Sequence, residues 1–445
     1  MKFFTNLNKN EKLLLLFIIL TPFAIKVILA FSLNTTLRSD SMVYDNLAKS
    51  ILYTGSYSFN GKPTAVLSCG YPLFLSLLYA IFGTEQISVK FFQSFIEIFS
   101  ILVFFLVSTK FFKTKYALVS TAIFAFFPSN ILFSQTILTE PLFGFLSLIL
   151  LNYCLGKKFP DGIFFIGLLW GYAVLVRASF IFSLALIPFY IFFFRKQIFE
   201  GYSKARFFKF IKFSFIFLCG VALVIAPWLI RNKLVIGTFT IATQGGFTFW
   251  AGSNPNATGT WYHKIEETDE RFNIDDEALR DKLFYKEGLK YAINNPHKFF
   301  ITGIKKLGYL FSSERMILLY FTPDEGKVRT STEVYRDINP LFIGFVNIPY
   351  FIVMILGTFG ILSFTEKRFF IYGFIISWLL VFFLFVALAR YHYVLIPFFV
   401  LGTTQTLFLR KRLFQEMQPL RIIIAVVFCL FLISVWTIEF YNLLK

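Results

Sequence analysis

Residues 13–45 read LLLLFIILTPFAIKVILAFSLNTTLRSDSMVYD, and this stretch decides how the rest of the chain is interpreted. Its first part, Leu13–Ser32, is apolar over about the 20 residues that an α-helix needs to cross a bilayer. The stretch then turns polar, with Arg38, Asp40 and Asp45 close together. A carboxylate at a membrane boundary costs desolvation energy unless it is solvated, paired or used. The sequence therefore predicts a membrane protein with a polar site just outside its first helix.

The composition points to the same class of protein. Hydrophobic residues make up 57% of the 445 residues and charged residues 15%, and the mean hydropathy is +0.69. Soluble domains carry about 25% charged residues, so a polytopic membrane protein is expected. The net charge of +18 does not indicate a nucleic-acid partner, because the basic residues alternate with apolar segments and set their orientation in the membrane.

The first apolar segment is longer than the core of a signal peptide, and no small-residue cleavage pattern stands out after it, so we expect a retained helix. The four cysteines form no close-spaced pair, which argues against a disulfide framework and a zinc site. The three histidines, among them His263 and His392, have no close ligand spacing either. No metal ligand is therefore predicted from the residues.

Eleven apolar segments are candidate membrane spans: 12–33, 87–109, 116–134, 141–156, 162–176, 178–194, 211–230, 341–363, 369–388, 392–409 and 421–440. Basic residues precede the first span and fill every second connection: Lys2, Lys9, Lys12, Lys110, Lys113, Lys115, Lys157, Lys158, Arg195, Lys196, Lys204, Arg206, Lys209, Lys212, Lys367, Arg368, Arg410, Lys411 and Arg412. Short cytoplasmic loops are rich in Lys and Arg. The alternation predicts a multi-pass protein of the plasma (inner) membrane with a cytoplasmic N-terminus.

This topology divides the chain into three predicted regions. Residues 1–230 form an N-terminal transmembrane catalytic module whose first external loop is 34–86, residues 231–340 form an extracytoplasmic region, and residues 341–445 form the C-terminal transmembrane helices. The resulting fold class is an all-α polytopic membrane bundle of about 11 transmembrane helices.

The two external segments have predicted elements of their own. In the first, Ser41–Tyr53 has apolar residues at helical spacing and reads as an interfacial helix, and Pro72–Phe82 is apolar but too short to span. Residues 61–64, Gly-Lys-Pro-Thr, predict a turn between them. In the second, an acidic run at Glu266–Glu277 precedes mixed helices that extend to Phe311.

The unusual polar residues near span ends sort to the external interface under this topology. They are Asp40, Asp45, Glu140, Arg177, Arg231 and the run Arg390-Tyr391-His392. A transporter is expected to place its ionisable groups near the midplane instead. Carboxylates beside arginines at one interface suit a base next to a phosphate, and hence chemistry on a lipid headgroup.

Short motifs along the chain also resemble a known family. They are Asp40 with Tyr44, Leu47-Ala48, Gly55 and Tyr57, then Pro63-Thr64, Gly70-Tyr71-Pro72, Thr139-Glu140-Pro141, Leu175-Val176-Arg177, Pro227-Trp228 with Arg231-Asn232, and Arg390-Tyr391 with Pro397-Phe398. Over about residues 10–410, this ordered set is similar to the polyprenyl-phosphate-sugar-dependent glycosyltransferases of the GT-C fold. The similarity is to the glycosyltransferase family 39-like branch, with protein O-mannosyltransferases and the aminoarabinose transferase that acts on lipid A. Two positions depart from the family pattern: Cys69 replaces a usual proline, and Ser41 replaces a common acidic residue.

The resemblance implies a role for each site residue. Asp40 would be the general base and Glu140 a second catalytic carboxylate. The implied substrate-binding residues are Tyr44, Lys62, Tyr71, Arg177, Arg231, Arg390, Tyr391 and His392, with Arg177 and Arg390 as the clamp on the leaving phosphate. The family would also allow a divalent metal, although nothing in this sequence demands a cofactor.

Each of these residues also has a structural interpretation that the sequence leaves open. Asp40 could be the N-cap of the Ser41–Tyr53 helix, and Glu140 could cap the fourth span. Arg177 and Arg390 could be snorkelling residues at the interface, and Lys62 and Arg231 could be ordinary surface residues. Asp45 is expected to be a solvated acid in the first turn of its helix.

Taken together, the sequence predicts a membrane glycosyltransferase that moves a sugar from a polyprenyl-phosphate donor to an extracytoplasmic acceptor with inversion. The expected partners are this lipid-linked donor, an acceptor glycan, lipid or protein, and the bilayer itself. The alternative is a transporter or flippase of lipid-linked sugars, which would need the basic clamp but no base. Neither the sugar nor the acceptor follows from the sequence.

A separate prediction concerns two charged residues well inside apolar spans. Lys26 lies in the first span and Glu97 in the second, each about 10–17 Å from the outer boundary at 1.5 Å per residue. An unpaired charge at that depth is costly. We therefore expect an intramembrane ion pair that joins the two spans.

Overall fold

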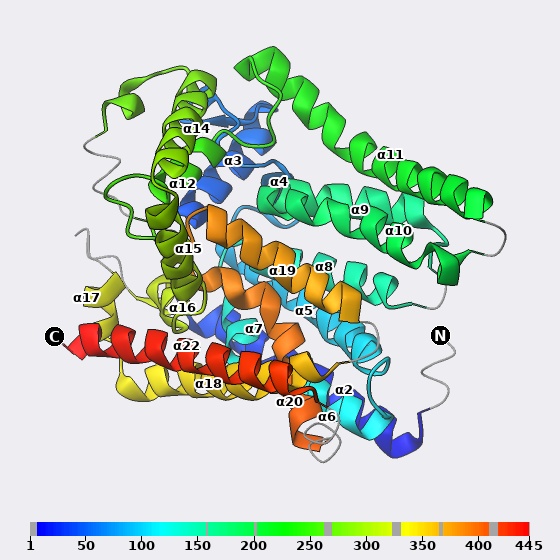
Figure 1. Ribbon diagram of the computed structural model, residues 1–445. Helices are drawn as coiled ribbons and strands as arrows, with labels where there is room; N and C mark the ends of the chain where they lie inside the picture. The colour runs from blue at the N-terminus through cyan, green and yellow to red at the C-terminus, as the bar shows by residue number, and fades with distance from the viewer. Residues whose placement is uncertain are drawn as a thin grey trace.

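The computed structural model in Figure 1 describes residues 7–156, 159–199, 203–261, 269–322, 331–364, 368–408 and 417–444. Over these residues the chain is almost entirely helical. The described residues form one two-stranded antiparallel sheet, a hairpin in which β1 (Ser58–Phe59) pairs with β2 (Lys62–Pro63). The predicted all-α polytopic class is therefore confirmed.

The helices of the N-terminal half are α2 (Lys9–Ser32), α3 (Asp40–Thr54), α4 (Gly70–Phe82), α5 (Gln86–Ser108), α6 (Thr114–Ala125), α7 (Pro128–Phe133), α8 (Glu140–Cys154), α9 (Ile163–Val176), the 3₁₀ helix η1 (Ala178–Ala185), α10 (Leu186–Ile198) and α11 (Ser203–Ile236). Those of the C-terminal half are α12 (Gly245–Ala251), η2 (Glu270–Asn273), α14 (Glu277–Asn294), α15 (Pro296–Leu310), α16 (Arg315–Leu318), η3 (Leu319–Phe321), α17 (Ser331–Arg336), α18 (Pro340–Ser363), α19 (Arg368–Leu384), η4 (Ala389–Leu395), α20 (Ile396–Phe408) and α22 (Pro419–Leu444).

Each of the eleven predicted spans falls on helical structure. Among the described residues, six helices are long and apolar enough to cross a membrane: Lys9–Ser32, Gln86–Ser108, Ala178–Ile198, Ser203–Ile236, Pro340–Ser363 and Pro419–Leu443. The prediction of one continuous helix over 116–134 was wrong. The helix stops after Ala125, and Pro128, which has no amide hydrogen to donate, starts the separate helix α7. The number of spans stays a prediction.

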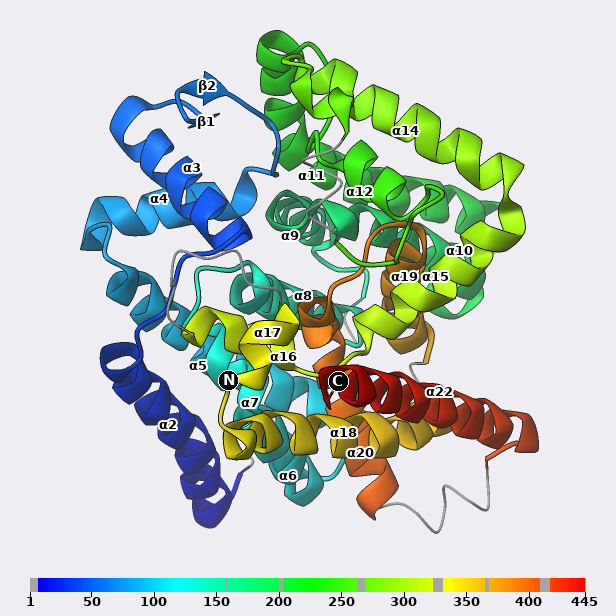
Figure 2. The same cartoon turned by 90° about the vertical axis from the view of Figure 1, so that its left-hand side faces the viewer.

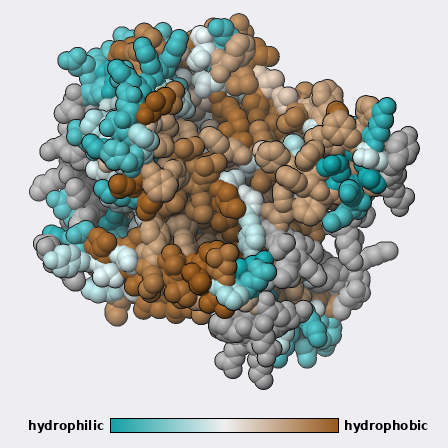
Figure 3. All heavy atoms as spheres, in the orientation of Figure 1, coloured by the Kyte–Doolittle hydropathy of each residue, from teal (hydrophilic) through white to brown (hydrophobic). Residues whose placement is uncertain are grey.

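The long helices run side by side, and the external segments gather at one end of the bundle. In Figure 1, α9, α11, α18 and α22 run across the page, and α3, α12, α14, α15 and α17 lie toward the left. We call this end, with α3, α4 and α12–α17, the loop face; Figure 2 views it directly. Figure 3 shows a hydrophobic band over the middle of the molecule with hydrophilic surface on both sides of it. This layering is that of a membrane protein.

The chain ends fit the predicted orientation. The described chain begins with α2 at the end opposite the loop face, and α22 ends near the loop face (Figure 1). Described basic residues such as Lys9 and Lys12 begin α2 at the opposite end. Several residues used for the orientation lie outside the described residues: Lys2, Lys157, Lys158, Lys367, Arg410, Lys411 and Arg412. Which side is cytoplasmic stays a prediction.

The predicted elements of the external segments are largely present. The helix expected at Ser41–Tyr53 is α3, and the apolar segment Pro72–Phe82 is α4, which begins two residues earlier, at Gly70. The predicted turn at 61–64 belongs to the β1–β2 hairpin. The predicted mixed helices up to Phe311 are α14 and α15. The first part of the predicted acidic run, and His263, lie within 262–268, outside the described residues.

Two pairs of helices are joined by specific contacts, one by an ion pair and the other by close glycine packing. Lys26 on α2 and Glu97 on α5 are both buried, with 3.7 Å between Nζ and Oε2, so the predicted ion pair is confirmed. Helices α18 and α20 pack through glycine, because a Cβ atom at Gly360 would collide with the backbone of Gly402. Small residues at such crossings let membrane helices approach closely. This packing fixes α20, which directly follows η4.

Candidate functional site

Asp40 begins α3 immediately after a strained turn. Ser39 has φ of +48°, a left-handed conformation that non-glycine residues rarely adopt. Ser39 occupies the N-cap position, and no side chain caps this helix, so the interpretation of Asp40 as an N-cap is wrong. The carboxylate of Asp40 instead pairs with the guanidinium of Arg390 on η4. It keeps 27% of its side chain exposed.

The segment before Asp40 is held by a segment nearly 300 residues away. The amide of Thr36 donates to the carbonyl of Tyr320 at 2.9 Å, and its hydroxyl donates to the carbonyl of Thr322 at 2.9 Å. Arg38 donates to the same Thr322 carbonyl at 3.1 Å. These bonds tie the start of α3 to η3, and so they fix where the Asp40 carboxylate stands.

Glu140 lies between the two arginines of the predicted clamp. Its carboxylate is fully buried, 3.5 Å from Nη1 of Arg177 and 3.9 Å from Nε of Arg390. Glu140 is also the first residue of α8, where the positive end of the helix dipole favours an anion. The site therefore joins two carboxylates and two guanidinium groups, drawn from α3, α8, η4 and the end of α9.

One aromatic ring, that of Tyr391, lies next to both guanidinium groups. Tyr391 lies 4.4 Å from Arg177 and 5.2 Å from Arg390, measured from guanidinium carbon to ring centroid. Trp378 on α19 lies 5.3 Å from Arg177 and donates its indole N–H to the Tyr391 carbonyl at 2.9 Å. Cations are attracted to aromatic faces at such distances. The ring thus orients both arginines without neutralising either.

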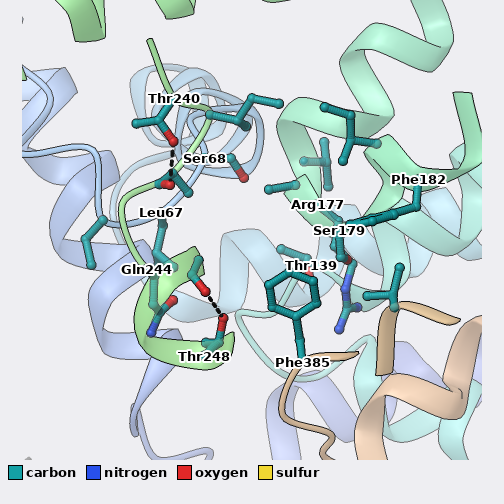
Figure 4. A pocket seen from close by; sticks show the side chains of 18 of the residues that line it. Leu67, Ser68, Thr139, Arg177, Ser179, Phe182, Thr240, Gln244, Thr248 and Phe385 are labelled. Carbon is teal, nitrogen blue, oxygen red and sulfur yellow. Dashed lines mark hydrogen bonds between the residues drawn. The ribbon is translucent and has the colours of Figure 1, made fainter. Parts of the chain in front are cut away.

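A cavity of about 570 Å³ opens beside these charged residues at the loop face. Figure 4 shows its walls, with Arg177, Ser179 and Phe182 on one side and Leu67, Thr240 and Gln244 on the other. The charged residues Asp40, Arg177 and Arg390 are part of the lining, with Tyr44, Thr139 and Tyr391. Much of the remaining wall is apolar: Ile181, Phe182, Ile225, Leu229, Val381 and Phe385. The cavity is therefore amphipathic, like a molecule with a charged head and a hydrocarbon tail.

Arg390 has hydrogen-bond donors to spare for a ligand. A guanidinium carries five N–H donors, and its Nη2 donates to Asp40. Within the described parts of the chain its buried Nε makes no hydrogen bond. A buried donor without a partner is costly and calls for an explanation. An anion in the cavity, such as a phosphate, would supply the missing acceptor.

Tyr44 stands beside these charges as a neutral phenol. Burial raises the pKa of its hydroxyl, and the nearby Asp40 carboxylate raises it further. Its ring packs edge-on against Tyr71, with 5.0 Å between centroids. Tyr44 can therefore donate or accept a hydrogen bond in the cavity without becoming an anion.

Four of the predicted substrate-binding residues do not line this cavity. Lys62 is 83% exposed on the hairpin and pairs with Asp275 at 3.2 Å. Tyr71 is buried and donates to Gln93 at 2.9 Å. Both residues therefore have partners within the protein, and neither contacts the cavity.

Arg231 and His392 also have partners in the protein. The guanidinium of Arg231 donates to the carbonyl of Thr64 at 2.6 Å and to that of Tyr57 at 2.9 Å, so it supports the first external loop. His392 is a buried residue of η4, with Nε2 3.0 Å from Glu314. Neither side chain reaches the cavity wall.

The expectation that Asp45 is solvated was wrong. Asp45 is buried, accepts a hydrogen bond from the Tyr79 hydroxyl at 2.6 Å and pairs with Lys49 at 2.8 Å. These contacts join α3 to α4. Asp45 is therefore a structural link within the first external loop.

Two residues near the site were missed from the sequence. Tyr320 on η3 is buried, and the charges of Asp40 and Glu140 add to burial in raising its pKa. Glu314 accepts a hydrogen bond from the Ser129 hydroxyl and faces His392. Their only signal was the polar run Ser312-Ser313-Glu314-Arg315 directly after an apolar helix.

The structure does not provide a metal site among the residues that it describes. No group of three or more histidine, cysteine, aspartate or glutamate side chains there is placed to hold an ion. Asp40 and Glu140 each face arginine. The chemistry available to these residues is proton transfer at Asp40 and stabilisation of negative charge by the arginines.

Comparison with solved structures shows that this bundle of apolar helices, with its amphipathic cavity at one end, has the GT-C-type glycosyltransferase fold. The structure of the archaeal oligosaccharyltransferase AglB from Archaeoglobus fulgidus, in complex with an inhibitory peptide and a dolichol-phosphate, superposes with a TM-score of 0.50 at 12% identity. The match covers 96% of this chain and 55% of AglB, so the chain spans about half the length of that protein. The predicted GT-C fold is confirmed.

Two further solved structures match with lower TM-scores. The Archaeoglobus fulgidus oligosaccharyltransferase in the apo form gives a TM-score of 0.49 at 13% identity, covering 94% of this chain and 55% of that one. ArnT from Cupriavidus metallidurans bound to undecaprenyl phosphate gives 0.42 at 10% identity, covering 88% and 77%. No family model matches the sequence, and neither does a curated protein. The likeness shows the fold alone.

Proposed function

We propose that this protein is a membrane glycosyltransferase that moves a sugar from a polyprenyl-phosphate donor to an acceptor on the extracytoplasmic side of the plasma (inner) membrane. The observation that carries this proposal is the Asp40–Arg390 pair in the wall of a cavity whose remaining lining is largely apolar. A lipid phosphate fits both halves of such a cavity, since the arginines match the phosphate and the apolar wall matches the chain.

In this proposal, the pairing with Arg390 makes the Asp40 carboxylate available as a base only when the donor is bound. Arg390 is the partner of Asp40 in the structure, and its Nε makes no hydrogen bond among the described residues, with the Glu140 carboxylate 3.9 Å away. A donor phosphate would compete for Arg390, with Arg177 as the second cation. Asp40 would then be released from its strongest partner while it remains next to the phosphate.

The reaction follows from this arrangement. The acceptor hydroxyl forms a bond to C1 of the sugar as the bond from C1 to the phosphate oxygen breaks, and its proton passes to the carboxylate of Asp40. The polyprenyl phosphate leaves with the electron pair, and Arg390 and Arg177 stabilise its added charge. A single displacement of this kind inverts the anomeric centre, as the family resemblance implies.

Glu140 and Tyr391 act through the arginines in this proposal. Glu140 is fully buried and does not line the cavity, so it holds Arg177 and Arg390 without contacting the acceptor. The Tyr391 ring lies next to both guanidinium groups and orients them. We therefore assign Glu140 a positioning role in place of the second catalytic role that the resemblance implies.

The competing function is a transporter or flippase of lipid-linked sugars, which needs the arginines but no base. The substitution Asp40→Asn distinguishes the two. Loss of a general base is expected to lower the transfer rate by about 10²–10⁴-fold. Asp275→Asn, which removes an exposed carboxylate that is 95% accessible, is the matched control.

The test uses a strain that lacks the gene and carries the wild-type, Asp40→Asn or Asp275→Asn protein. Mass analysis of its envelope glycans should show that Asp40→Asn fails to restore the missing sugar, whereas Asp275→Asn restores it. Native mass spectrometry with polyprenyl phosphate should show that purified Asp40→Asn protein still binds the lipid, and that Arg390→Met protein binds it less. Full restoration of the sugar by Asp40→Asn would overturn the proposal.

A further inference from the structure

Helices α14 and α15 form an amphipathic element at the edge of the loop face. They are joined at Asn295, and in Figure 1 they cross the direction of the long spans α11, α18 and α22. In Figure 2 they lie along the rim of the loop face, with α10 and α19 beneath α15. This placement is that of helices lying in the plane of a membrane surface.

The outward side of the pair is unusually apolar for a loop segment. Six large apolar residues are each between 42% and 68% exposed: Leu279, Leu289, Ile293, Phe300, Ile301 and Ile304. The inward side is a narrow stripe on which Phe284 packs against Phe247 and Trp250 of α12. A contiguous exposed apolar surface marks contact with a partner or a membrane.

Lysines are interleaved with these apolar residues on α14. Lys282, Lys286 and Lys290 are exposed and follow one another at four-residue spacing, which puts them on the same side of the helix. In the described chain no carboxylate lies within 4.0 Å of their ammonium groups, whereas Lys49 and Lys62 do have such partners. This side of α14 therefore has an unbalanced positive charge.

The charge identifies the partner. Lysines that flank apolar residues on a helix at a membrane surface can extend their charged ends to lipid headgroups while the apolar residues enter the acyl boundary. In Figure 3 the hydrophobic band reaches the region of α14 and α15, where hydrophobic and hydrophilic side chains alternate. A soluble protein partner would leave that continuity with the band unexplained.

We propose that α14 and α15 form an interfacial membrane-binding element that selects anionic phospholipid headgroups through Lys282, Lys286 and Lys290. The anionic lipid would lie beside the mouth of the cavity, because Tyr285 of α14 is part of the cavity wall. This inference concerns how the protein meets the bilayer, and it holds whether or not the protein transfers sugar.

The first experiment measures how deeply α14 lies in the bilayer. A nitroxide label is placed at Ile293 or, as a control, at Glu287 on another side of α14, in a protein whose four cysteines are replaced. In nanodiscs that contain 30% phosphatidylglycerol, the Ile293 label should be reached by oxygen and shielded from a water-soluble nickel complex, and the Glu287 label should show the reverse. Equal exposure of the two labels to the nickel complex would overturn membrane contact and would indicate a soluble partner.

The second experiment measures headgroup selection. The triple variant Lys282→Gln, Lys286→Gln, Lys290→Gln is compared with Lys62→Gln, which removes one exposed charge elsewhere on the loop face. Phosphatidylglycerol retained from mixed nanodiscs, counted by native mass spectrometry against phosphatidylcholine, should fall about 100-fold in the triple variant, since each of the three lysines near an anionic surface favours binding by about fivefold. Retention equal to that of Lys62→Gln would overturn the headgroup assignment.

Both readouts stay informative if a variant is inactive. Size-exclusion chromatography first shows that each variant is folded and monodisperse, and a variant that fails is replaced by the single substitution Lys286→Gln, for which about a fivefold loss is expected. Because neither readout uses sugar transfer, failure here leaves the glycosyltransferase proposal standing, and failure of Asp40→Asn leaves this one standing.

Discussion

The ion pair between Lys26 and Glu97 gives the sharpest test of the fold. Both side chains are 1% exposed, and the Tyr393 hydroxyl donates a hydrogen bond to Glu97 at 3.0 Å. At the 3.7 Å separation of the pair, an effective dielectric constant of about 20 gives an attraction of about 4.5 kcal/mol. Glu97→Gln would leave the Lys26 ammonium buried without a counter-charge, and we expect a loss of about 3–5 kcal/mol in the free energy of unfolding.

The double variant carries the decisive information. Lys26→Met combined with Glu97→Gln removes both charges, so most of the loss caused by Glu97→Gln should be recovered, with a coupling free energy of about 3 kcal/mol. Lys90→Met is the matched control, because Lys90 is also buried on α5 but donates to the Leu33 carbonyl instead of pairing with Glu97. Its effect should add to that of Glu97→Gln within about 0.5 kcal/mol.

The assay is reversible unfolding of the purified protein in mixed micelles by an increasing fraction of dodecyl sulfate, followed by circular dichroism. The four proteins of the cycle are compared under one condition. If the losses of Lys26→Met and Glu97→Gln simply add in the double variant, the two charges do not interact and the reasoning is refuted.

Three further outcomes are expected. Burial lowers the pKa of Lys306 from 10.5 to about 7. Between these pH values the unfolded chain binds one proton more than the folded chain, so the free energy of unfolding should rise by about 1.4 kcal/mol per pH unit. Unfolding titrations at about pH 8 and 9.5 measure this slope, and Lys306→Met should remove it. Arg231→Met should cost about 1–3 kcal/mol, because it leaves the Thr64 carbonyl without its donor, whereas a surface role for Arg231 would give no loss in the same titration. Gly360→Ala should destabilise by about 1–3 kcal/mol by forcing α18 from Gly402, and an unchanged melting temperature would contradict that packing.

The sequence predicted those parts of the molecule that depend on local composition. Apolar runs of sufficient length predicted the positions of the long helices, and the depth of Lys26 and Glu97 within such runs predicted their pairing. The grouping of Asp40 with Arg390 followed from orientation alone, since both had to lie at the same membrane interface. The break at Pro128 was missed because apolar composition does not separate one helix from two short ones.

What the sequence did not predict depends on which loops pack together. Nothing local to Asp45 shows that α4 will cover it, and nothing local to Arg231 shows that the carbonyls of Tyr57 and Thr64 will lie next to its guanidinium. His392 pairs with Glu314, which lies 78 residues earlier in the sequence. Glu314 belongs to a short polar run that matches none of the family motifs. Such contacts between distant segments follow from tertiary packing, which single residues do not encode.

The motif Gly70-Tyr71-Pro72 illustrates how a sequence signature can belong to a site without touching a ligand. A Cβ atom at Gly70 would lie 2.5 Å from the carbonyl carbon of Leu175 and from the amide nitrogen of Val176. Those backbone atoms lead directly into Arg177. Any larger residue at position 70 would therefore displace the arginine from the cavity. The residue at position 70 and the arginine at position 177 are therefore coupled through backbone packing, although they lie more than 100 residues apart in the sequence.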